Sequence, residues 1–529
     1  MSSSSSDITQ TNPTTDWKYV SEGGATIVFS YVGPPNPTFD GMVLRLRKQP
    51  NVPVGVRDSD SESDGEESED EDPSISFQRQ CMSRLVPKEH LPKLQSVVVR
   101  ADPVRSVSVD EVTGSYRDVE KDEEREMPGA FPTPTPIQGP PHIHSNRWLR
   151  ALSKAHEHER PENRRKTGGV DVHKHKGVLA TDLVGGGGAG GGVSVEIKPK
   201  WSFLPNPTHL SPSTRDIKTK TCRFCMHSYV RNNNSNHQPS DSTHHAQGLV
   251  AHGYCPLDLF SGDEERVRNA LGALYDAWVV SEGKVNNLKV FLGGKVLKVH
   301  EKHRLWDPSE KEKEKDADDA LLRTTFISSL LPLLTRTPAL QVLNRLQRTL
   351  DMLDVEGLGK VWEAFHRHHH QPGQGVPELG EGMEEPTIDE WMGFIDGYLE
   401  QEPGGATTFL PGPPPSSTGE QQQYTQPQLR SFLLAYLLSA TFKDCSIMVR
   451  MGKLGASDDN GDPDPRNVTI IDLDPKSMTR LRKWEVLDGE IVREYERLVA
   501  LGEGKGGTER KVCVDAFGGG AGGSGGRRV

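Results

Sequence analysis

A short apolar strand that ends in two lysines is the feature that most constrains this sequence. Residues Val193 to Ile197 form the expected strand, and Lys198, Pro199 and Lys200 follow it directly. The proline fixes the backbone between the two ammonium groups, and such groups are costly to bury unless anions face them. The segment therefore predicts a phosphate-binding site, and a solvated turn is the alternative interpretation.

The composition predicts a folded part that is shorter than the 529 residues of the chain. Hydrophobic residues make up 33%, and there are 53 glycines and 38 prolines, which is typical of a chain with many loops and inserts. Ten carboxylates without a single base lie between Asp58 and Asp72, so most of the formal net charge of −12 is local. This acidity argues against a globally basic nucleic-acid binder and is compatible with a basic pocket.

The cysteines and the apolar runs indicate a soluble intracellular protein. The Ser/Thr-rich start has no apolar signal core, and the longest apolar run, Phe432 to Leu438, is far too short to span a bilayer. Six cysteines in so long a chain favour reduced thiols over a disulfide framework.

Three strands are expected near the N-terminus. Residues Trp17 to Val32 read as two strands joined by Glu22, Gly23, Gly24 and Ala25, and Met42 to Lys48 as the third. The small turn residues allow backbone amides to approach the phosphates of a nucleotide, with a plain hairpin as the alternative. Alternation places Arg45 on the polar face of the third strand. Kinases hold ATP with a cation in such a position.

The second half of the chain is expected to be mainly helical. We predict a helix from Asp263 to Val280 capped by Ser261, three helices between Leu321 and Phe365, a buried helix from Leu429 to Ala440 and a last helix from Arg480 to Ala500.

Two acidic residues flank a predicted pair of strands near the C-terminus. Asp444 opens the strand that ends at Val449, and Asp472 lies near the end of the strand Val468 to Lys476. Protein kinases use one carboxylate to accept the proton of the substrate hydroxyl and another to hold magnesium. Asp474 could share the metal, because Mg²⁺ prefers carboxylate oxygens. Ordinary turn aspartates are the alternative.

One further segment carries cations and cysteines together. Arg223, His227 and Arg231 recur every four residues, so a helix would align them on one face. Cys222 and Cys225 form a CxxC that could hold zinc, and a zinc-dependent nucleic-acid module is a competing hypothesis. A second CxxC or a well-spaced histidine pair is missing, so zinc is not expected.

Several motifs resemble those of a known family. In chain order they are EIKPK, RF-x-MH, Y-x-PLDLFSG, NNLKVF, KDCSIM and IDLD-x-K. Together with the EGGA and LRLRK segments near the N-terminus, they resemble the inositol-pentakisphosphate 2-kinase family, in its fungal form with long inserts. The matching blocks span about Trp17 to Trp484.

The resemblance implies an α+β, divergent two-lobed kinase-like fold, with an antiparallel-sheet N-lobe and a larger mixed α/β C-lobe. It implies transfer of the γ-phosphate of ATP, with Mg²⁺, to the 2-hydroxyl of inositol 1,3,4,5,6-pentakisphosphate, which gives inositol hexakisphosphate (phytate). We further expect a monomer of the nucleus or cytoplasm that neither enters membranes nor binds nucleic acid directly.

Site roles are likewise implied by the resemblance. Asp444 is the general base, and Lys198 steadies the transferring phosphoryl group. The residues expected to bind the nucleotide and its magnesium are Glu22, Gly23, Gly24, Ala25, Arg45, Asp182, Asp472 and Asp474. The residues expected to bind the inositol phosphate are Arg164 (or the neighbouring Arg165), Lys198, Lys200, Arg223, His227, Arg231, Asn286, Lys289, Lys476 and Arg480.

Four positions depart from the family pattern. Ser21 and Thr26 replace a glycine and an asparagine of the nucleotide loop, and Trp484 stands where tyrosine is frequent. Lys289 replaces an arginine and gives up bidentate geometry. The altered loop motivates a competing hypothesis, a non-catalytic inositol-phosphate-binding scaffold. A kinase of different inositol phosphate specificity is the alternative among enzymes.

The expected organisation has a disordered start (1–15), an N-lobe (16–184) with an acidic insert at about 57–74, and a Gly-rich linker (185–192). A C-lobe (193–500) follows, with inserts at about 232–253 and 371–428, and then a flexible tail (501–529).

Overall fold

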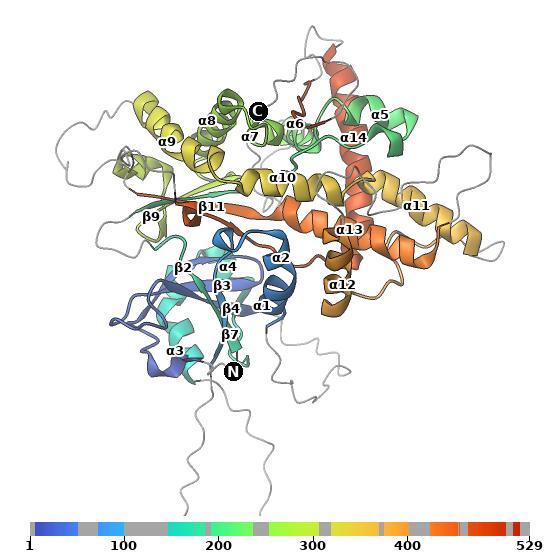
Figure 1. Cartoon of the computed structure of the whole chain (residues 1–529). Coiled ribbons are helices and arrows are strands. Elements are labelled where there is room, and N and C mark those ends of the chain that lie inside the picture. The colour runs from blue at the N-terminus through green and yellow to red at the C-terminus, as the bar shows by residue number, and fades with distance from the viewer. Residues whose placement is uncertain are drawn as a thin grey trace, which may run out of the picture. The chain divides into compact units, whose positions relative to one another are not determined.

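The computed structural model describes residues 6–50, 72–99, 147–174, 176–185, 192–235, 253–305, 319–369, 375–400, 424–452, 454, 464–503 and 511–518 (Figure 1). It contains both helices and sheets, with many antiparallel strand pairs, which agrees with the α+β prediction. The chain divides into two compact units. The first unit comprises Met1–Thr38, Arg45–Glu62 and Ser96–Gly177, and the second comprises Phe39–Leu44, Ser63–Gln95 and Val178–Val529.

A seven-stranded sheet has the order β1-β5-β7-β4-β3-β2, and β6 pairs with β4. Its strands are β1 (Ser6–Asp7), β2 (Trp17–Glu22), β3 (Thr26–Tyr31), β4 (Met42–Pro50), β5 (Leu94–Val98), β6 (Gly168–Val170) and β7 (Lys176–Thr181). β2 and β3 form the expected antiparallel hairpin, with Glu22 opposite Ile27. The alternation predicted for β4 is confirmed, because Leu44 and Leu46 are buried and Arg45 is not.

The first unit has its own small core. Helix α3 (Arg147–His156) buries Trp148 and Leu149, and α4 (Glu162–Arg165) follows. The indole nitrogens of Trp17 and Trp148 donate hydrogen bonds to the hydroxyl and the carbonyl of Thr11, both at 2.9 Å. Ile8, in a 3₁₀ turn, is fully buried. Residues 6–15 therefore differ from the disordered start that the sequence predicted, because this isoleucine anchors them.

The second unit is built on a five-stranded sheet with the order β10-β9-β8-β11-β12. Its strands are β8 (Val193–Ile197), β9 (Leu288–Leu292), β10 (Lys295–Val296), β11 (Ser446–Met451) and β12 (Val468–Ile471), and all neighbouring pairs are antiparallel. Every residue of β8 is buried, as expected for a central strand that is covered on both faces.

Helices supply most of the second unit. They are α1 (Pro73–Phe77), α2 (Ser83–Leu85), α5 (Pro212–Lys218), α6 (Arg223–Ser235), α7 (Pro256–Leu259), α8 (Glu264–Val280), α9 (Asp319–Thr335), α10 (Ala339–Leu350), α11 (Asp354–His369), α12 (Ile388–Leu399), α13 (Gln426–Asp444) and α14 (Leu481–Glu503). A π-helical turn (Gln78–Met82) joins α1 to α2. The three helices predicted between residues 321 and 365 are confirmed as α9, α10 and α11.

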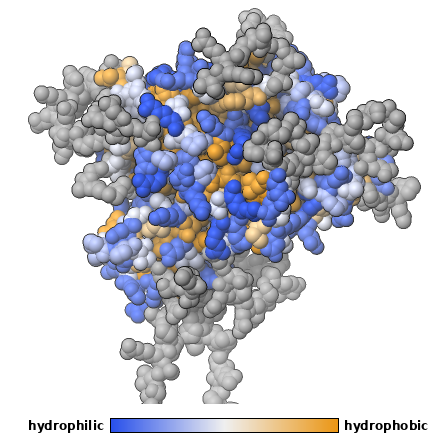
Figure 2. All heavy atoms as spheres, in the orientation of Figure 1, coloured by the Kyte–Doolittle hydropathy of each residue, from blue (hydrophilic) through white to orange (hydrophobic). Residues whose placement is uncertain are grey.

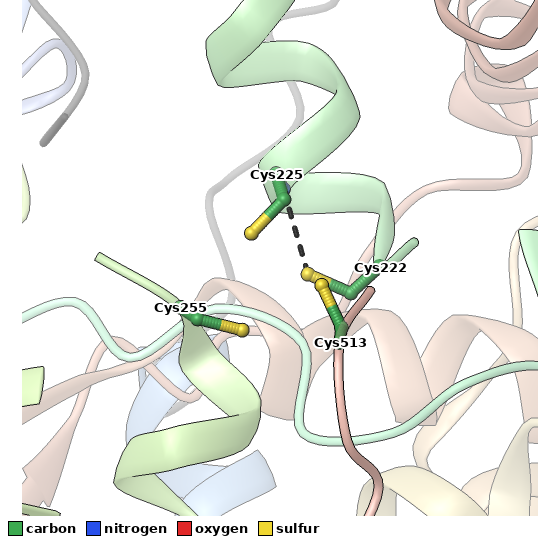
Figure 3. A group of neighbouring side chains, drawn as sticks. All are labelled: Cys222, Cys225, Cys255 and Cys513. Atoms are coloured by element: carbon green, nitrogen blue, oxygen red, sulfur yellow. Dashed lines mark hydrogen bonds between the residues drawn. The ribbon is translucent and has the colours of Figure 1, made fainter. Parts of the chain in front are cut away.

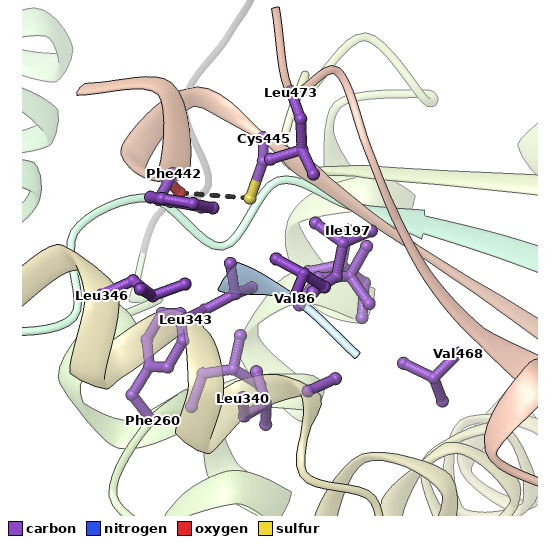
Figure 4. Packing of buried hydrophobic residues seen from close by; sticks show 14 of the residues in the cluster. Val86, Ile197, Phe260, Leu340, Leu343, Leu346, Phe442, Cys445, Val468 and Leu473 are labelled. Carbon is purple, nitrogen blue, oxygen red and sulfur yellow. Dashed lines mark hydrogen bonds between the residues drawn. The ribbon is translucent and has the colours of Figure 1, made fainter. Parts of the chain in front are cut away.

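The core of the second unit lies between the sheet and these helices (Figure 4). Leu340, Leu343 and Leu346 recur at helical spacing on α10 and are buried. They gather in one cluster with Ile197 of β8 and Phe442 of α13. Each such side chain contributes about 1.5–3 kcal/mol through its burial, which fixes the sheet edge that carries the site.

Two local predictions were wrong. Asp444 does not open a strand but is the last residue of α13, and β11 begins at Ser446. Ser261 does not cap α8. The carboxylate of Asp263 accepts the amide of Arg266 at 2.9 Å, because Asp263 has the extended backbone of an N-cap.

Most of the predicted inserts lie outside the described residues, including 51–71, 186–191, 236–252, 401–423 and 519–529. No single helix in the described ranges is long and apolar enough to cross a membrane. The bent pair Asp319–Thr335 and Ala339–His368 passes that test by length and composition only, and its apolar side chains belong to the core.

Candidate active site

The strand ends of the second unit's sheet bring distant residues to one edge. β8 ends at Ile197, which pairs with Ile447 near the start of β11 and with Leu288 at the start of β9. β12 ends at Ile471, opposite Ser446. The residues just beyond these ends must therefore lie near one another, and they include Lys198, Asn286, Asp444 and Asp472.

Ion pairs across this edge confirm the convergence. The ammonium of Lys198 lies 3.6 Å from a carboxylate oxygen of Asp472. The ammonium groups of Lys200 and Lys476 lie 3.5 and 3.1 Å from the two carboxylate oxygens of Asp444. Asp444 thus stands between two lysines, and its side chain is still 59% exposed, so a substrate hydroxyl can reach it.

The backbone at this edge adopts an unusual conformation. Lys200 has φ of +66° and Asp472 has φ of +62°, in the left-handed region that residues with a Cβ seldom enter. Such conformations cost free energy and gather at functional sites.

A cavity of about 370 Å³ opens beside Asp444. Its lining contains eight residues that the sequence predicted for substrate or catalysis: Lys200, Arg223, His227, Arg231, Asn286, Asp444, Lys476 and Arg480. Trp484, one of the departures from the family pattern, also lines it. The segments that meet here are far apart in the chain, so the fold gathers the predicted cations into one basic cavity.

Helix α6 presents the predicted row of cations to this cavity. Arg223 is its first residue, and the guanidinium of Arg231 donates to the ring of His227 at 3.0 Å. The carboxylate of Asp488 accepts Nε of Arg223 at 2.8 Å and also pairs with the buried Lys218 at 2.8 Å. Asp488 therefore holds Arg223 in place from α14.

Sequence reasoning missed six lining residues of the described chain: Trp201, Phe224, Tyr436, Ala440, Lys443 and Leu487. The guanidinium of Arg223 and the ammonium of Lys443 lie 4.9 and 4.2 Å from the centre of the Trp201 ring, within the range of cation–π attraction. Lys443 also pairs with the buried Asp351. Trp201 directly follows Lys200, and Lys443 directly precedes Asp444. This proximity to predicted site residues is the signal by which both could have been found.

The crowded cations shift the protonation of their neighbours. Burial, and then the nearby Arg231 and Arg223, lower the pKa of His227 to about 4. Burial raises the pKa of Asp444, but Lys200 and Lys476 outweigh it and bring that pKa below its usual value. Burial lowers the pKa of Lys200 more than Asp444 raises it.

Five predicted substrate or metal residues are not part of the described cavity lining, namely Arg164, Lys198, Lys289, Asp472 and Asp474. Lys289, on β9, pairs with Glu196 at 2.9 Å. Asp474 has an exposed side chain, and its carbonyl accepts the hydroxyl of Thr441. Among the carboxylates at this edge, Asp472 faces Lys198 and accepts the hydroxyl of Ser446 at 3.3 Å.

Asp182, the predicted adenine neighbour, is buried in the second unit. Its carboxylate accepts the amides of Val184 and Gly185 at 2.9 and 2.6 Å. Its own amide donates to the carbonyl of Gly41 at 2.8 Å.

The predicted nucleotide loop lies in the first unit. The carboxylate of Glu22 is 1% exposed and pairs with Arg160 at 2.9 Å and Lys48 at 2.5 Å, so it holds the hairpin instead of facing solvent. Ala25 accepts the amide of Lys48 at 2.9 Å. Gly23 and Gly24 have open space where a Cβ would stand. Arg45 and Arg164, also of this unit, are half-buried.

A second group of reactive side chains lies apart from the cavity lining. The described chain brings Cys222 and Cys225 together with Cys255 and Cys513 (Figure 3). The prediction against zinc rested on the lack of further ligands, and that reason does not hold. Sequence reasoning missed the cluster because its last two members are single cysteines, far apart in the chain.

Comparison with known proteins settles the family. The family model described as inositol-pentakisphosphate 2-kinase matches residues 19–490. The chain belongs to this family. A protein of Cryptococcus neoformans named inositol-pentakisphosphate 2-kinase is 29% identical over 487 residues, 90% of this chain and 92% of that protein. One of Arabidopsis thaliana with the same name is 25% identical over 514 residues, 91% and 93% of the two chains.

A third relative, from Danio rerio, matches only part of the chain, with 39% identity over 105 residues. That stretch is 20% of this inositol-pentakisphosphate 2-kinase family member and 18% of the relative. The family match includes the hairpin of the first unit except for its first two residues, Trp17 and Lys18, and every described residue that lines the basic cavity. It ends before the segment 511–518 that carries Cys513.

Proposed function

We propose that this chain transfers the γ-phosphate of ATP to the 2-hydroxyl of inositol 1,3,4,5,6-pentakisphosphate and so makes inositol hexakisphosphate. Family membership supports the activity. The observation that carries the assignment to a site is the basic cavity, in whose described lining Asp444 is the single carboxylate and is held between Lys200 and Lys476.

The charge of the substrate fits the cavity. Five phosphates at roughly −1.5 to −2 each give the ligand about −8 to −10 near neutral pH. The lining supplies Lys200, Arg223, Arg231, Lys476 and Arg480. Charge-assisted hydrogen bonds are the stronger ones, and arginine can grip a phosphate with two of them.

The chemistry follows from the environment of Asp444. Its lowered pKa keeps it ionised at neutral pH, so it accepts a hydrogen bond from the substrate hydroxyl and orients its oxygen. An ionised, weakly basic carboxylate takes the proton late, which suits the loose transition state of phosphoryl transfer. Lys198, paired with Asp472, is the cation we assign to the transferring phosphoryl group.

For the nucleotide we propose a kinase-like, two-lobed division of labour, with an N-lobe at 16–184 and a C-lobe at 193–500. Open space at Gly23 and Gly24 supports close approach of phosphates to the hairpin. Arg45 and Asp182 complete the ATP site. Asp472, with Asp474, would hold Mg²⁺, which neutralises charge on the phosphates.

The remaining assignments are part of the same proposal. Arg164 and Lys289 are assigned to the substrate from outside the cavity lining. We propose a monomer in the nucleus or cytoplasm, without membrane insertion or direct nucleic-acid binding. Hydrophilic residues predominate on the described surface of the face in Figure 2, with hydrophobic residues between them.

The deciding experiment is an assay of the purified chain with ATP, Mg²⁺ and a panel of inositol phosphates. We expect one major product, inositol hexakisphosphate from the 1,3,4,5,6-pentakisphosphate, identified by chromatography and NMR. If only another inositol phosphate isomer gave product, the proposed substrate specificity would be wrong. Tight inositol phosphate binding without turnover or nucleotide binding would favour a scaffold.

Changing Asp444 to Asn tests the base. We expect turnover to fall about 10²- to 10⁴-fold, the usual contribution of a positioned base. Affinity for inositol pentakisphosphate, measured by calorimetry, should stay or improve, because a negative charge facing the phosphates is removed. Asp389→Asn, at an exposed position of α12, is the control and should match the parent. An Asp444→Asn enzyme that keeps most of its turnover would refute the assignment.

A further inference from the structure

Three cations and three carboxylates of the second unit form a closed ring of contacts that begins and ends at Trp201 in the cavity lining. In order, its members are Trp201, Arg223, Asp488, Lys218, Asp354, Asp351 and Lys443. They come from α5, α6, α11, α13 and α14, the residue that ends α10 and the loop after β8. Of these seven, the described cavity lining contains Trp201, Arg223 and Lys443. The other four therefore act on a ligand through those three.

Asp488 and Lys218 make up the half of the ring that reaches Arg223. The two carboxylate oxygens of Asp488 accept one hydrogen bond each, from Nε of Arg223 and from the ammonium of Lys218, both at 2.8 Å. The guanidinium of Arg223 lies 4.9 Å from the centre of the Trp201 ring. Because Lys218 occupies one oxygen of Asp488, it fixes the direction in which the other oxygen faces Arg223.

Asp354 and Asp351 make up the half that reaches Lys443. The ammonium of Lys218 donates to the carboxylate of Asp354 at 2.5 Å, and the amide of Asp354 donates to one carboxylate oxygen of Asp351 at 2.9 Å. The other oxygen of Asp351 accepts the ammonium of Lys443, which lies 4.2 Å from the centre of the Trp201 ring. Lys443 directly precedes the proposed base, so this half of the ring fixes its neighbour.

The ring is both buried and charged. The side chains of Lys218, Asp354 and Asp488 are 2%, 3% and 5% exposed, and Glu356 also lies 3.5 Å from Lys218. Burial lowers the pKa of Lys218, but the two aspartates outweigh it and raise that pKa. Burial raises the pKa of Asp354 to about 6, so both groups are charged at neutral pH. Buried ion pairs add little stability over apolar residues of similar volume, so stability alone does not account for the ring.

The backbone of Asp354 is an independent indication of a functional constraint. Its φ of +61° lies in the left-handed region, where residues with a Cβ are rare and where strain is commonly kept for a functional purpose. Asp354 is the first residue of α11, and its carboxylate also accepts the amide of Glu356 at 3.0 Å. This conformation places both the amide and the carboxylate of Asp354 in the ring.

We propose that Lys218 is a positioning residue for the inositol phosphate. Through Asp488 it fixes Arg223, and through Asp354 it supports the half of the ring that ends at Lys443. The ring thus sets the spacing of two cavity cations before the ligand arrives, which lowers the entropic cost of binding a polyanion. The gain in affinity rests on the proposed function, whereas the fixing of Arg223 in the free protein does not.

The free protein tests the fixing of Arg223. We expect isotope-labelled arginine to give a sharp, slowly exchanging Nε–H signal in NMR for Arg223, identified by its absence in Arg223→Gln. Lys218→Met should broaden or abolish this signal, because Asp488 loses the cation that orients it. Lys220→Met, the same change at an exposed lysine just after α5, should leave it unchanged. An unaltered Arg223 signal in Lys218→Met would overturn the proposal.

Ligand binding tests the positioning role. In Lys218→Met, calorimetry should show roughly tenfold weaker binding of inositol hexakisphosphate, the effect of losing a hydrogen bond to a charged group, and binding of an ATP analogue within about twofold of the parent. In the Arg223→Gln background the same change should weaken binding less than about threefold, because residues that act through one another are not additive. Equal losses in the two backgrounds would refute action through Arg223.

A charge-balanced variant separates positioning from misfolding. Lys218→Met combined with Asp354→Asn removes one cation and one carboxylate, and asparagine tolerates the left-handed backbone. Its midpoint of urea unfolding should return toward that of the parent, while its affinity for inositol hexakisphosphate should stay as weak as in Lys218→Met. Recovery of affinity together with stability would refute the positioning role. A parent protein that shows the Arg223 signal but binds no inositol phosphate would instead contradict the proposed function alone.

Discussion

At the scale of single residues, His227 shows how the cavity controls protonation. Burial and the flanking Arg231 and Arg223 hold its pKa at about 4, against an ordinary value near 6.5. Without a bound ligand, His227 is therefore a neutral imidazole at neutral pH. A bound polyanion reverses the balance, because its phosphates favour the imidazolium.

The pH dependence of binding follows from that shift. Between about pH 6.5 and 4 the free folded protein keeps His227 neutral, so ligand binding should take up a proton there. Calorimetry in buffers of different ionisation enthalpy at pH 5.5 should show this uptake, and His227→Gln should reduce it by up to one proton per site. Equal uptake by the parent and His227→Gln would assign the proton to the ligand phosphates alone.

The same lowered pKa of His227 also makes the stability of the folded protein depend on pH. The unfolded state binds a proton as pH falls below about 6.5 and the folded state does not until about 4. The contribution of His227 to the free energy of unfolding is therefore complete above pH 6.5 and declines as pH falls through this window.

Site residues could be predicted from the sequence where the charge of the side chain alone indicates its role. Lys200, Arg223 and Lys476 were expected at a phosphate site, and all three line the cavity. Lys443 and Trp201 were missed because their contacts with each other and with Asp351 arise only when α13 and the loop after β8 meet. The thiol cluster was missed for the same physical reason.

At the scale of elements, one buried glutamine joins α10 to two parts of the site. The side chain of Gln347 is fully buried. Its carbonyl oxygen accepts the amide of Ser202 at 3.0 Å, and its amide nitrogen donates to the carbonyls of Lys200 and Phe442 at 3.1 and 2.9 Å. It thus fixes the loop that carries Lys200 relative to the end of α13, two residues before Asp444.

Gln347→Leu should therefore harm both stability and turnover. Buried amides and carbonyls left without partners cost about 1–3 kcal/mol, so we expect roughly 3 kcal/mol less stability in urea unfolding. Turnover should fall at least tenfold because the spacing of Lys200 and Asp444 is lost. Gln341→Leu, on the exposed side of the same helix, serves as control. A stable, fully active Gln347→Leu enzyme would contradict this role.

Element types were easier to predict than their ends. The strands β8, β11 and β12 and helices α9 to α11 follow from apolar periodicity. Asp444 was assigned to a strand because only Lys443 and Asp444 separate the apolar run of α13 from that of β11 in the sequence. The helix extends through both charges because Lys443 is buried against Asp351 and Trp201.

At the scale of the whole molecule, the two compact units carry residues with different predicted binding functions. The residues that line the basic cavity belong to the second unit, and the hairpin assigned to the nucleotide belongs to the first. Arg160, 4% exposed, holds that hairpin through Glu22 and also donates to the carbonyl of Gly168 at 2.6 Å.

Arg160→Leu should separate the two binding activities. It leaves the buried Glu22 with one cation in place of two, and breaking a buried ion pair costs about 3–5 kcal/mol. We expect affinity for an ATP analogue to drop at least tenfold and affinity for inositol hexakisphosphate to drop less than threefold. Arg150→Leu, at an exposed position of α3, is the matched control. Equal losses of both affinities would show that the tasks are not divided in this way.

The left-handed backbone of Lys200 and Asp472 has a consequence for anyone who wishes to make this protein more robust. Glycine adopts that conformation without penalty, so Lys200→Gly or Asp472→Gly would relax the backbone while deleting a charge that the proposed chemistry needs. Heat tolerance and catalysis are therefore in direct competition at these two positions. Searches for hardier variants should leave both untouched and look elsewhere in the chain.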